Sequence, residues 1–348
     1  MQQVAADPRA VLAAWDLGTV VGLTPAGGTA GGTWRVAASS GEYFLRRRGA
    51  RTSAEARLGF DHGLRVQLLA HGVPTAAAVS TRHGARWLRA EHGVYEVYPF
   101  VRGLAFSPGD PGQIAAAARA LARFHQVAAG YRPPGYQPEP VAQYTTLGFS
   151  PATSWRMDDP DLQLATVEAV GRLATTPAER GVVARCRARL QRMQAAYAGP
   201  SFARLCGWVI HGDYTPANLL FTPAGGVAGI FDLDWSLPGA RCRDVADALF
   251  FFATHPRQVD PASIWSLTAA AEFDPVRCRL LLDAYQQLAP LAAHELEAVP
   301  LAFCGRWISI RLEGMAKVDA ADRFRFFARD LELPMDWLEA HWPGLMRA

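Results

Sequence analysis

Lysine is nearly absent from this sequence. Lys317 is the only one, so arginine supplies the other 34 of the 35 basic residues. Any role that a lysine fills in other proteins therefore falls here to a planar guanidinium, which binds carboxylates and phosphates through parallel hydrogen bonds. The five cysteines are odd in number, widely spaced and without a Cys-x-x-Cys pair, which argues against a disulfide framework and against structural zinc.

Long hydrophobic runs and long basic runs are missing as well. No apolar stretch approaches the roughly 18 residues of a membrane-spanning helix, and residues 1–14 lack the basic start and apolar core of a signal peptide. The net charge is only +3, and Arg46-Arg47-Arg48 is the one tight basic cluster. We therefore expect a cytoplasmic protein whose partners include neither a membrane nor nucleic acid.

The composition favours a folded chain with two domains. Half of the 348 residues are hydrophobic and 19% are charged. Strand-like segments dominate up to about residue 100 and helical periodicity dominates after Gly103, so we predict an α+β chain divided into residues 1–100 and 101–348. The first part is predicted to contain strands at Leu17–Leu23, Glu42–Arg47, Trp87–Ala90 and Val94–Phe100, with helices at Pro8–Trp15 and Ala54–Ala70. The second is predicted to contain helices at Gln113–Ala129, Leu162–Leu173, Pro177–Tyr197, Arg243–Ala253, Ala262–Ala271, Pro275–Leu288, Ala292–Gly314 and Ala320–Leu331.

The stretch Val209–Trp235 carries the strongest chemical signal. Two short apolar runs, Leu219–Phe221 and Val227–Phe231, flank a turn rich in proline and glycine, which is typical of a β-hairpin. The residues His211, Gly212, Asp213 and Asn218 precede the first run, while Asp232 and Asp234 follow the second. A hairpin brings its two ends together, so we expect these polar residues to converge.

Such a set of carboxylates and a carboxamide suits phosphoryl transfer. The oxygens of Asn218 and Asp232 are the ligands that Mg²⁺ prefers, and Asp213 is left to hold a hydroxyl group. In phosphoryl transfer the protein mainly positions groups and neutralises charge, which this set does. Each residue alone also fits an ordinary turn or strand end, so the hypothesis depends on all three together.

The first part of the chain supplies candidates for binding a nucleotide. Residues 24–33 form a glycine-rich turn in which Gly28 and Gly31 could lay backbone amides against phosphates, although a plain hairpin has the same composition. Arg46 follows on the next strand, where a kinase-like fold places a basic phosphate-binding residue. A solvated arginine on an edge strand is the alternative for Arg46.

Two further features of this part stay open. The helix Ala54–Ala70 offers Glu55 and Asp61 as partners for Arg46, and the spacing back from Pro74 slightly favours Asp61. After the strand Val94–Phe100, extended backbone near Tyr98 and Phe100 could bind the edge of an adenine. The same residues also fit a plain linker between domains.

In this order of features the chain resembles the aminoglycoside phosphotransferase and choline kinase superfamily, which includes type II homoserine kinases. The resemblance runs from about Leu17 to about Arg311 and is most specific at His211–Asn218 and Ile230–Asp234. It implies a bilobal, protein-kinase-like fold with a small antiparallel sheet in the N-lobe, a mainly helical C-lobe, and ATP and Mg²⁺ bound between them.

The resemblance also implies roles for individual residues. Asp213 would match the catalytic base, while Asn218 and Asp232 would match the magnesium ligands. Asp234 would match a second, variable acidic residue, and Arg46 would replace the usual strand lysine. His211 would support the loop through hydrogen bonds. Asp244, at the start of the next helix, could hydrogen-bond the same turn or simply cap its own helix.

We therefore expect an ATP- and Mg²⁺-dependent kinase that phosphorylates a hydroxyl of a small molecule. The alternative is a non-catalytic nucleotide-binding or scaffold protein with the same fold. A protein kinase is disfavoured because Asp-Phe-Gly and Ala-Pro-Glu signatures are missing. For the acceptor two hints exist: the acidic run Asp158–Asp161 suits an aminoglycoside, and Arg306 or Arg311 suits the carboxylate of an amino acid.

Overall fold

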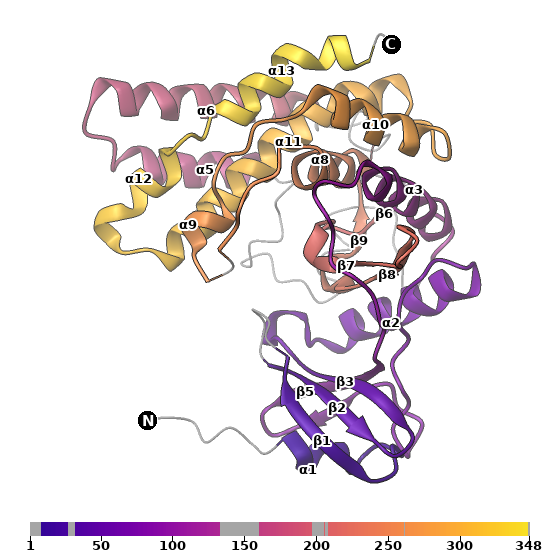
Figure 1. Cartoon of the computed structure of the whole chain (residues 1–348). Helices are drawn as coiled ribbons and strands as arrows, with labels where there is room; N and C mark the ends of the chain where they lie inside the picture. The colour runs from indigo at the N-terminus through magenta and orange to yellow at the C-terminus, as the bar shows by residue number, and fades with distance from the viewer. Residues whose placement is uncertain are drawn as a thin grey trace.

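Five antiparallel strands form a sheet at the N-terminal end of the protein (Figure 1). A computed structural model describes residues 8–26, 32–132, 160–196, 205, 208–260 and 262–346. The strand order is β1-β2-β3-β5-β4, so β3 lies at the centre of the sheet. The strands are β1 (Val20–Pro25), β2 (Thr33–Ala38), β3 (Gly41–Arg48), β4 (Leu88–Ala90) and β5 (Gly93–Pro99).

The two faces of this sheet differ in chemistry. Because side chains alternate along a strand, Leu45 and Val97 point to one face, where they pack with Trp15 and the helix α1 (Pro8–Leu12) in a small hydrophobic core. Arg46 and Glu96, which are paired across β3 and β5, point to the other face. The sheet therefore turns a charged face toward the rest of the protein.

The helix α2 (Glu55–Ala70) lies between the sheet and the helical remainder of the chain (Figure 1). Its apolar residues Phe60, Leu64 and Leu68 join the larger hydrophobic core of the helical part. Two of its buried polar residues contact the charged face of the sheet: Asp61 pairs with Arg48, and His62 lies at hydrogen-bond distance from Glu96. The helix thus packs against both parts of the protein.

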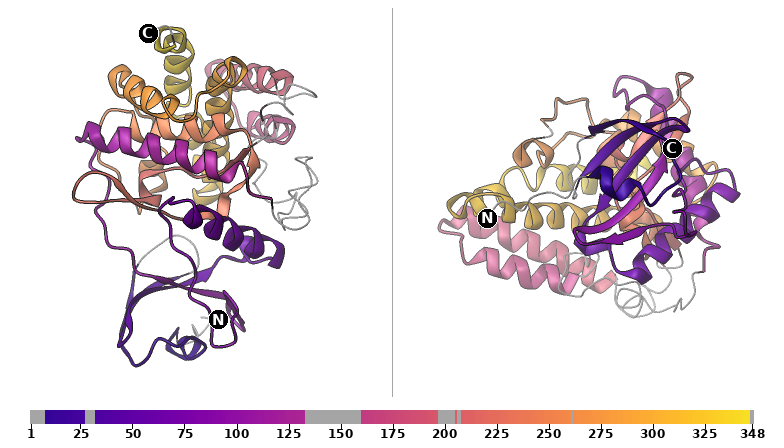
Figure 2. Two further views of the ribbon diagram at one scale, coloured as in Figure 1. Left: turned by 90° about the vertical axis from the view of Figure 1, so that its right-hand side faces the viewer. Right: turned by 90° about the horizontal axis from the view of Figure 1, so that it is seen from below.

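The remainder of the chain is mainly helical and lies at the opposite end of the molecule from the sheet (Figure 2). It also contains two small antiparallel pairs, β6 (Trp208–Ile210) with β9 (Leu237–Gly239) and β7 (Leu219–Phe221) with β8 (Val227–Ile230). The helices are α3 (Pro111–Ala128), α5 (Pro160–Gly171), α6 (Pro177–Ala196), α8 (Arg241–Phe252), α9 (Ile264–Leu267), α10 (Pro275–Gln286), α11 (Ala293–Gly314), α12 (Arg323–Ala328) and α13 (Leu333–Leu345). The predicted α+β fold class, with its N-terminal sheet and helical remainder, is confirmed.

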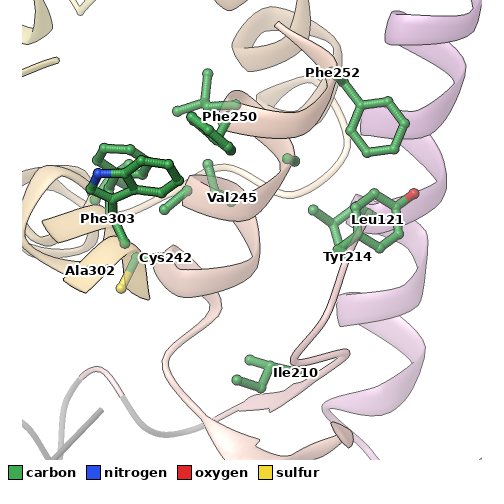
Figure 3. Packing of buried hydrophobic residues seen from close by; sticks show 14 of the residues in the cluster. Leu121, Ile210, Tyr214, Cys242, Val245, Phe250, Phe252, Ala302 and Phe303 are labelled. Atoms are coloured by element: carbon green, nitrogen blue, oxygen red, sulfur yellow. The ribbon is translucent and has the colours of Figure 1, made fainter. Parts of the chain in front are cut away.

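Aromatic and aliphatic side chains from α3, α8, α11 and the strand β6 meet in the core of the helical part (Figure 3). Phe250 on α8 contacts Phe303 on α11, with ring centroids 5.6 Å apart. On the other side of α8, the ring of Phe252 lies 5.7 Å from Tyr214, which follows the His211–Asp213 turn. This packing fixes the polar turn to the helical scaffold.

Several sequence predictions about this part are wrong. Residues 237–239 form the strand β9, although Pro238 and Gly239 are residues typical of turns. Pro238 is compatible with it because the pair has only two strands, and both are edges. The predicted helix Ala262–Ala271 is reduced to the four residues of α9, and Ala320–Leu331 contains a 3₁₀ turn before α12.

The helix α13 was not predicted at all. Two prolines in this segment, Pro334 and Pro343, argue against a helix when only the sequence is considered. Pro334 lies in the first turn of the helix, where the amide hydrogen that proline lacks would have no acceptor within the helix.

Among the helices in the described ranges, none combines the length and the apolar character needed to cross a membrane.

Leu121 tests the contribution of this core to stability. The side chain is fully buried on α3, so Leu121→Ala should leave a cavity and lower the free energy of unfolding by roughly 2–5 kcal/mol. Urea denaturation measures the change. The exposed neighbour Arg119 provides the control, since Arg119→Ala should stay within about 0.5 kcal/mol of the wild type. Equal losses in the two variants would contradict the described packing.

Candidate active site

The hairpin β7–β8 brings together the polar residues at its two ends. Asn218 closes a 3₁₀ turn (Pro216–Asn218) before β7, and its Nδ2 donates to the Asp213 backbone oxygen at 2.8 Å and to Asp213 Oδ2 at 3.0 Å. After β8, the Phe231 amide donates to the Asn218 carbonyl at 2.9 Å, which places Asp232 beside this pair. Asp232 itself has a left-handed backbone, with φ of 56°.

Gly212 is required by the close approach of two backbone segments. Its φ is +82°, and a Cβ atom at this position would lie 2.2 Å from the Trp235 carbonyl oxygen. Both facts exclude other residues, because L side chains rarely adopt this conformation and the contact is with backbone that cannot move aside. The glycine thus allows the His211–Asp213 turn to lie against the segment that carries Asp232 and Asp234.

Asp244 holds the same turn from the first turn of α8. Its carboxylate accepts hydrogen bonds from the His211 amide at 2.6 Å, from the Gly212 amide at 2.9 Å and from His125 Nε2 at 2.9 Å. Burial opposes ionisation, but the hydrogen bonds from His125 and Gly212 outweigh it and keep the pKa of Asp244 below its ordinary value. No hydrogen bond to its own helix is found in the described chain, so Asp244 contacts the turn and is no cap of α8.

The two buried histidines of this network have defined tautomers. An ionised Asp244 only accepts, so His125 Nε2 donates to it and His125 Nδ1 accepts from the Tyr285 hydroxyl at 2.7 Å. His211 Nε2 donates to the Phe231 carbonyl at 2.9 Å, and its Nδ1 accepts from the Asp213 amide at 3.3 Å. Burial lowers the pKa of His211, which keeps this ring neutral.

Asp213 is held by a partner that the sequence only hinted at. Arg306 on α11 donates from Nη2 to Asp213 Oδ1 at 2.9 Å and from Nε to Asp247 Oδ1 at 2.9 Å. Because Asn218 donates to the other oxygen of Asp213, both carboxylate oxygens are oriented. The sequence places Arg306 within a predicted helix, but no sequence pattern identifies Asp213 as its partner.

Arg46 lies against the carboxylates that follow the hairpin. Its guanidinium donates to both oxygens of Asp234, at 2.9 and 2.7 Å, and to Asp232 Oδ1 at 3.2 Å. Burial disfavours its charge, but Asp234 and Asp232 outweigh burial and raise the pKa of Arg46. Burial, together with the neighbouring Asp234, raises the pKa of Asp232 to about 6, so this carboxylate lacks sufficient positive charge nearby.

The predicted pairing of Arg46 with the helix α2 is wrong. Asp61 instead pairs with Arg48 at 2.7 Å and with Arg65 at 2.9 Å, while Glu55 is exposed. Arg46 and Arg48 are two residues apart on β3, so strand alternation places both on the charged face and does not decide which one reaches the helix. Burial opposes ionisation of Asp61, but Arg65 and Arg48 outweigh it and lower its pKa.

Arg48 was missed as a site residue. It is fully buried and also pairs with Glu96 at 2.9 Å and with Asp234 at 2.9 Å. Thr52 donates to Asp234 Oδ2 at 2.9 Å from the turn after β3. Asp234 thus accepts contacts from three residues of the sheet part, and this carboxylate joins the sheet to the hairpin.

The other predicted nucleotide-binding residues differ in their placement. The ring of Tyr98 is buried beneath Arg65, whose guanidinium lies 5.1 Å from the ring centroid, and burial raises the pKa of its hydroxyl. Phe100 packs against Arg35 at 4.6 Å, and its amide donates to the Glu42 carbonyl at 3.0 Å. Gly28 and Gly31 lie outside the described residues.

Comparison with known proteins gives the class of the enzyme. Residues 22–291, which make up most of the chain, match the model of the Phosphotransferase enzyme family. The fold and this match define a phosphotransferase of the small-molecule kinase type, an enzyme class that uses an alcohol group as the acceptor. The chain belongs to the Phosphotransferase enzyme family.

Curated relatives and solved structures agree with this assignment. The chain is 25% identical over 297 residues to a homoserine kinase of Parvibaculum lavamentivorans, covering 84% of this chain and 79% of the relative. It is 26% identical over 290 residues to a homoserine kinase of Azorhizobium caulinodans, with 83% and 78% covered. The resemblance predicted from the sequence is confirmed.

Among solved structures, the fold matches a microcompartment-associated aminopropanol kinase with a TM-score of 0.68, at 16% identity over 97% of each chain. It also matches an aminoglycoside phosphotransferase from Alicyclobacillus acidocaldarius with a TM-score of 0.61, at 17% identity, covering 99% of this chain and 98% of the other. At these identities the structural matches show the shared fold alone.

Gly212→Ala tests the close approach of the His211–Asp213 turn to the Trp235 backbone. Gly225 has nearly the same φ, +83°, but nothing lies within 4 Å of a Cβ atom placed there. We expect Gly225→Ala to lower the free energy of unfolding by about 1 kcal/mol through backbone strain, and Gly212→Ala to lower it clearly further and to reduce kcat. Urea denaturation and steady-state kinetics measure both. Indistinguishable variants would show that the Trp235 contact is unimportant.

Arg48→Met tests the buried ion pairs between the sheet and α2. The variant leaves Asp61 and Glu96 buried with less positive charge, so the free energy of unfolding should fall by roughly 3–5 kcal/mol. Arg89→Met, on the edge strand β4 of the same sheet, removes an exposed arginine and should cost less than about 1 kcal/mol. Chemical denaturation compares the two, and a stable Arg48→Met protein would refute the proposed importance of the network.

Proposed function

We propose that this enzyme transfers the γ-phosphate of ATP, in the presence of Mg²⁺, to a hydroxyl of a small molecule. The observation that carries the proposal is the convergence of Asp213, Asn218 and Asp232 at the ends of one hairpin, beneath Arg46 of the sheet. Phosphoryl transfer needs a group that positions the acceptor hydroxyl, ligands for a metal and positive charge for the phosphates. The four residues supply these functions.

The residues present fit a magnesium ion. Since Asn218 Nδ2 faces Asp213, the Oδ1 of the same amide is left for a ligand. The raised pKa of Asp232 marks a carboxylate that a further cation would stabilise. Within the described ranges no group of three or more His, Cys, Asp or Glu side chains could form a metal cage, as is usual for Mg²⁺ held by one or two protein ligands and the substrate phosphates.

A solved structure of the same fold supports this nucleotide and metal assignment. The amicoumacin kinase hAmiN, whose TM-score with this protein is 0.66, holds AMP-PNP and Ca²⁺. When bound here, Mg²⁺ would neutralise charge on the phosphates. Asn218 and Asp232 would hold it, and Arg46 would give up its contact with Asp232 to bind phosphate oxygens.

The acceptor hydroxyl belongs next to Asp213. Arg306 and Asn218 each orient one oxygen of this carboxylate, so it cannot rotate away from a bound alcohol. The Asp213 carboxylate then accepts the hydroxyl proton as the phosphoryl group is transferred. His211 and Asp244 hold the backbone of the same turn without touching the reacting atoms.

We further propose a division of labour along the chain. Residues 1–100 bind the nucleotide through Arg46, the turn with Gly28 and Gly31, and the extended backbone near Tyr98 and Phe100. Residues 101–348 contribute the base, the metal ligands and the acceptor pocket. The contacts of Asp234 with Arg46, Arg48 and Thr52 support this view, since they join the two parts beside the proposed metal ligands.

Asp213→Ala tests the proposed base. Loss of proton acceptance and positioning should reduce kcat by roughly 10²- to 10⁴-fold for a hydroxylated amine, amino acid or sugar that the wild type phosphorylates. An ADP-release assay measures the rate, and ATP binding should persist because Asn218 and Asp232 are intact. The exposed Asp283 on α10 gives a control, since Asp283→Ala should retain the wild-type rate. Wild-type turnover by Asp213→Ala would exclude the assignment, and ATP binding without turnover by the wild type would favour a non-catalytic protein.

A further inference from the structure

Three charged residues on one face of α8 act on the His211–Asp213 turn. Arg243 Nη2 donates to a carbonyl of the turn at 2.8 Å, and Asp244 accepts from two of its backbone amides. Asp247 follows three and four positions later, so it shares the same face of the helix. The first two residues hold the backbone of the turn, whereas Asp247 contacts the side chain of Arg306.

Asp247 is a buried carboxylate that depends on Arg306 for its hydrogen bonds. The residue is only 1% exposed. Arg306 Nε donates to Asp247 Oδ1 at 2.9 Å and lies 3.3 Å from Oδ2, while Nη2 of the same guanidinium donates to Asp213 Oδ1 at 2.9 Å. Burial raises the pKa of Asp247 to about 6, although Arg306 and Arg243 oppose the rise. A carboxylate that is unfavourable to bury indicates a role beyond packing.

Arg306 divides one edge of its guanidinium between two carboxylates. Nε and Nη2 donate in parallel from this edge, which suits the two oxygens of a single carboxylate. Two other arginines of the protein adopt that geometry. Arg241 donates from Nε and Nη2 to the two oxygens of Glu295, each at 2.7 Å, and Arg185 binds Glu332 in the same way at 2.6 and 2.7 Å. Arg306 therefore departs from the arrangement that one carboxylate alone produces.

The divided edge leaves the second oxygen of Asp213 outside the reach of Arg306. That oxygen, Oδ2, accepts from Asn218 Nδ2 at 3.0 Å. Without a carboxylate on Nε, the edge would bind both oxygens of Asp213, as Arg241 binds Glu295. It would then compete for Oδ2 with Asn218 and with an acceptor hydroxyl.

We propose that Asp247 is a positioning residue that keeps Arg306 from binding both oxygens of the base Asp213. Because Asp247 occupies Nε, Arg306 holds one oxygen of the base through Nη2 alone. The other oxygen stays with Asn218 and remains open to the hydroxyl of the acceptor. Asp247 thus acts through Arg306 and touches no reacting atom. The proposal rests on the proposed kinase function, since only a base needs this free oxygen.

Asp247→Leu tests the proposal, because leucine is similar in size and leaves Nε without a carboxylate. Misplacement of the base should lower kcat by roughly ten- to a hundredfold, measured by ADP release with the acceptor used for Asp213→Ala. KM for ATP should stay near the wild-type value, since the proposed metal ligands are intact. Asp247→Asn keeps an oxygen that accepts from Nε and should retain much more activity than Asp247→Leu.

A double-mutant cycle with Arg306 separates this role from a purely structural one. Arg306→Met removes the edge that would bind the base, so the double variant should be no less active than Asp247→Leu and should recover part of its kcat. Two independent structural defects would multiply instead. Glu332→Leu is the matched control, because it removes the carboxylate partner of Arg185, which contacts neither Arg306 nor the turn in the described structure. This control should keep the wild-type kcat.

Crystal structures of the free wild type and of Asp247→Leu test the rearrangement apart from catalysis. In the variant, Arg306 Nε and Nη2 should bind the two oxygens of Asp213, and Asn218 should keep only its contact with the Asp213 backbone oxygen. Should Asp247→Leu fail to fold, Asp247→Ala replaces it in both measurements. Arg306→Lys adds a further check, because it keeps the charge without parallel donors, so loss of Asp247 should cost little kcat in that background.

The outcomes separate failure of this proposal from failure of the kinase function. Two contacts from Arg306 to Asp213 in the variant crystal, together with recovered kcat in the cycle, support the proposal. If the wild type releases no ADP with any acceptor, the kinase function fails, but the crystal structures still show whether Asp247 holds Arg306 away from the second oxygen. An Arg306 that stays on one oxygen of Asp213 in Asp247→Leu, or losses that multiply in the cycle, would overturn the proposal.

Discussion

A buried charge in this structure is stable where an opposite charge or several hydrogen bonds compensate it, and the candidate site depends on this constraint. Asp234 is the clearest case. This carboxylate follows the hairpin β7–β8, yet Arg46, Arg48 and Thr52 of the sheet part all contact it. Neutralising one buried aspartate thus brings the sheet over the hairpin ends and places Arg46 beside Asp232. The same requirement ties α2 to the sheet through Asp61.

The turn His211–Asp213 is positioned by hydrogen bonds to its backbone. Asp244 accepts from two backbone amides and from His125, so the His211–Asp213 turn is held by the first turn of α8. Gly212 allows the turn to touch the Trp235 backbone. Asp213 therefore keeps its orientation without a bound substrate, which is the preorganisation that phosphoryl transfer relies on.

The sequence predicts the elements of this site better than its contacts. Apolar runs bounded by polar turns identify the hairpin, and the order of motifs identifies the family, because both signals are local or sequential. The partner of Arg46 could not be derived, since Arg46 and Arg48 share one face of β3. The contact between Asp213 and Arg306 joins residues 93 positions apart. Helix periodicity indicates that such an arginine is buried, but it does not identify the residue that the arginine contacts. The helix α13 was not predicted because it contains two prolines, and tertiary packing stabilises it.

Where compensation is incomplete, the structure indicates a missing ligand. The pKa of Asp232 is raised by burial and by the neighbouring Asp234, so this carboxylate suits a metal ion. Calorimetric titration with ATP, with and without Mg²⁺, tests the central claim most directly when the wild type is compared with Asp232→Asn. Mg²⁺ should strengthen ATP binding by about tenfold or more in the wild type and have little effect in Asp232→Asn. An equal effect of Mg²⁺ in both proteins would contradict a metal site at the end of this hairpin.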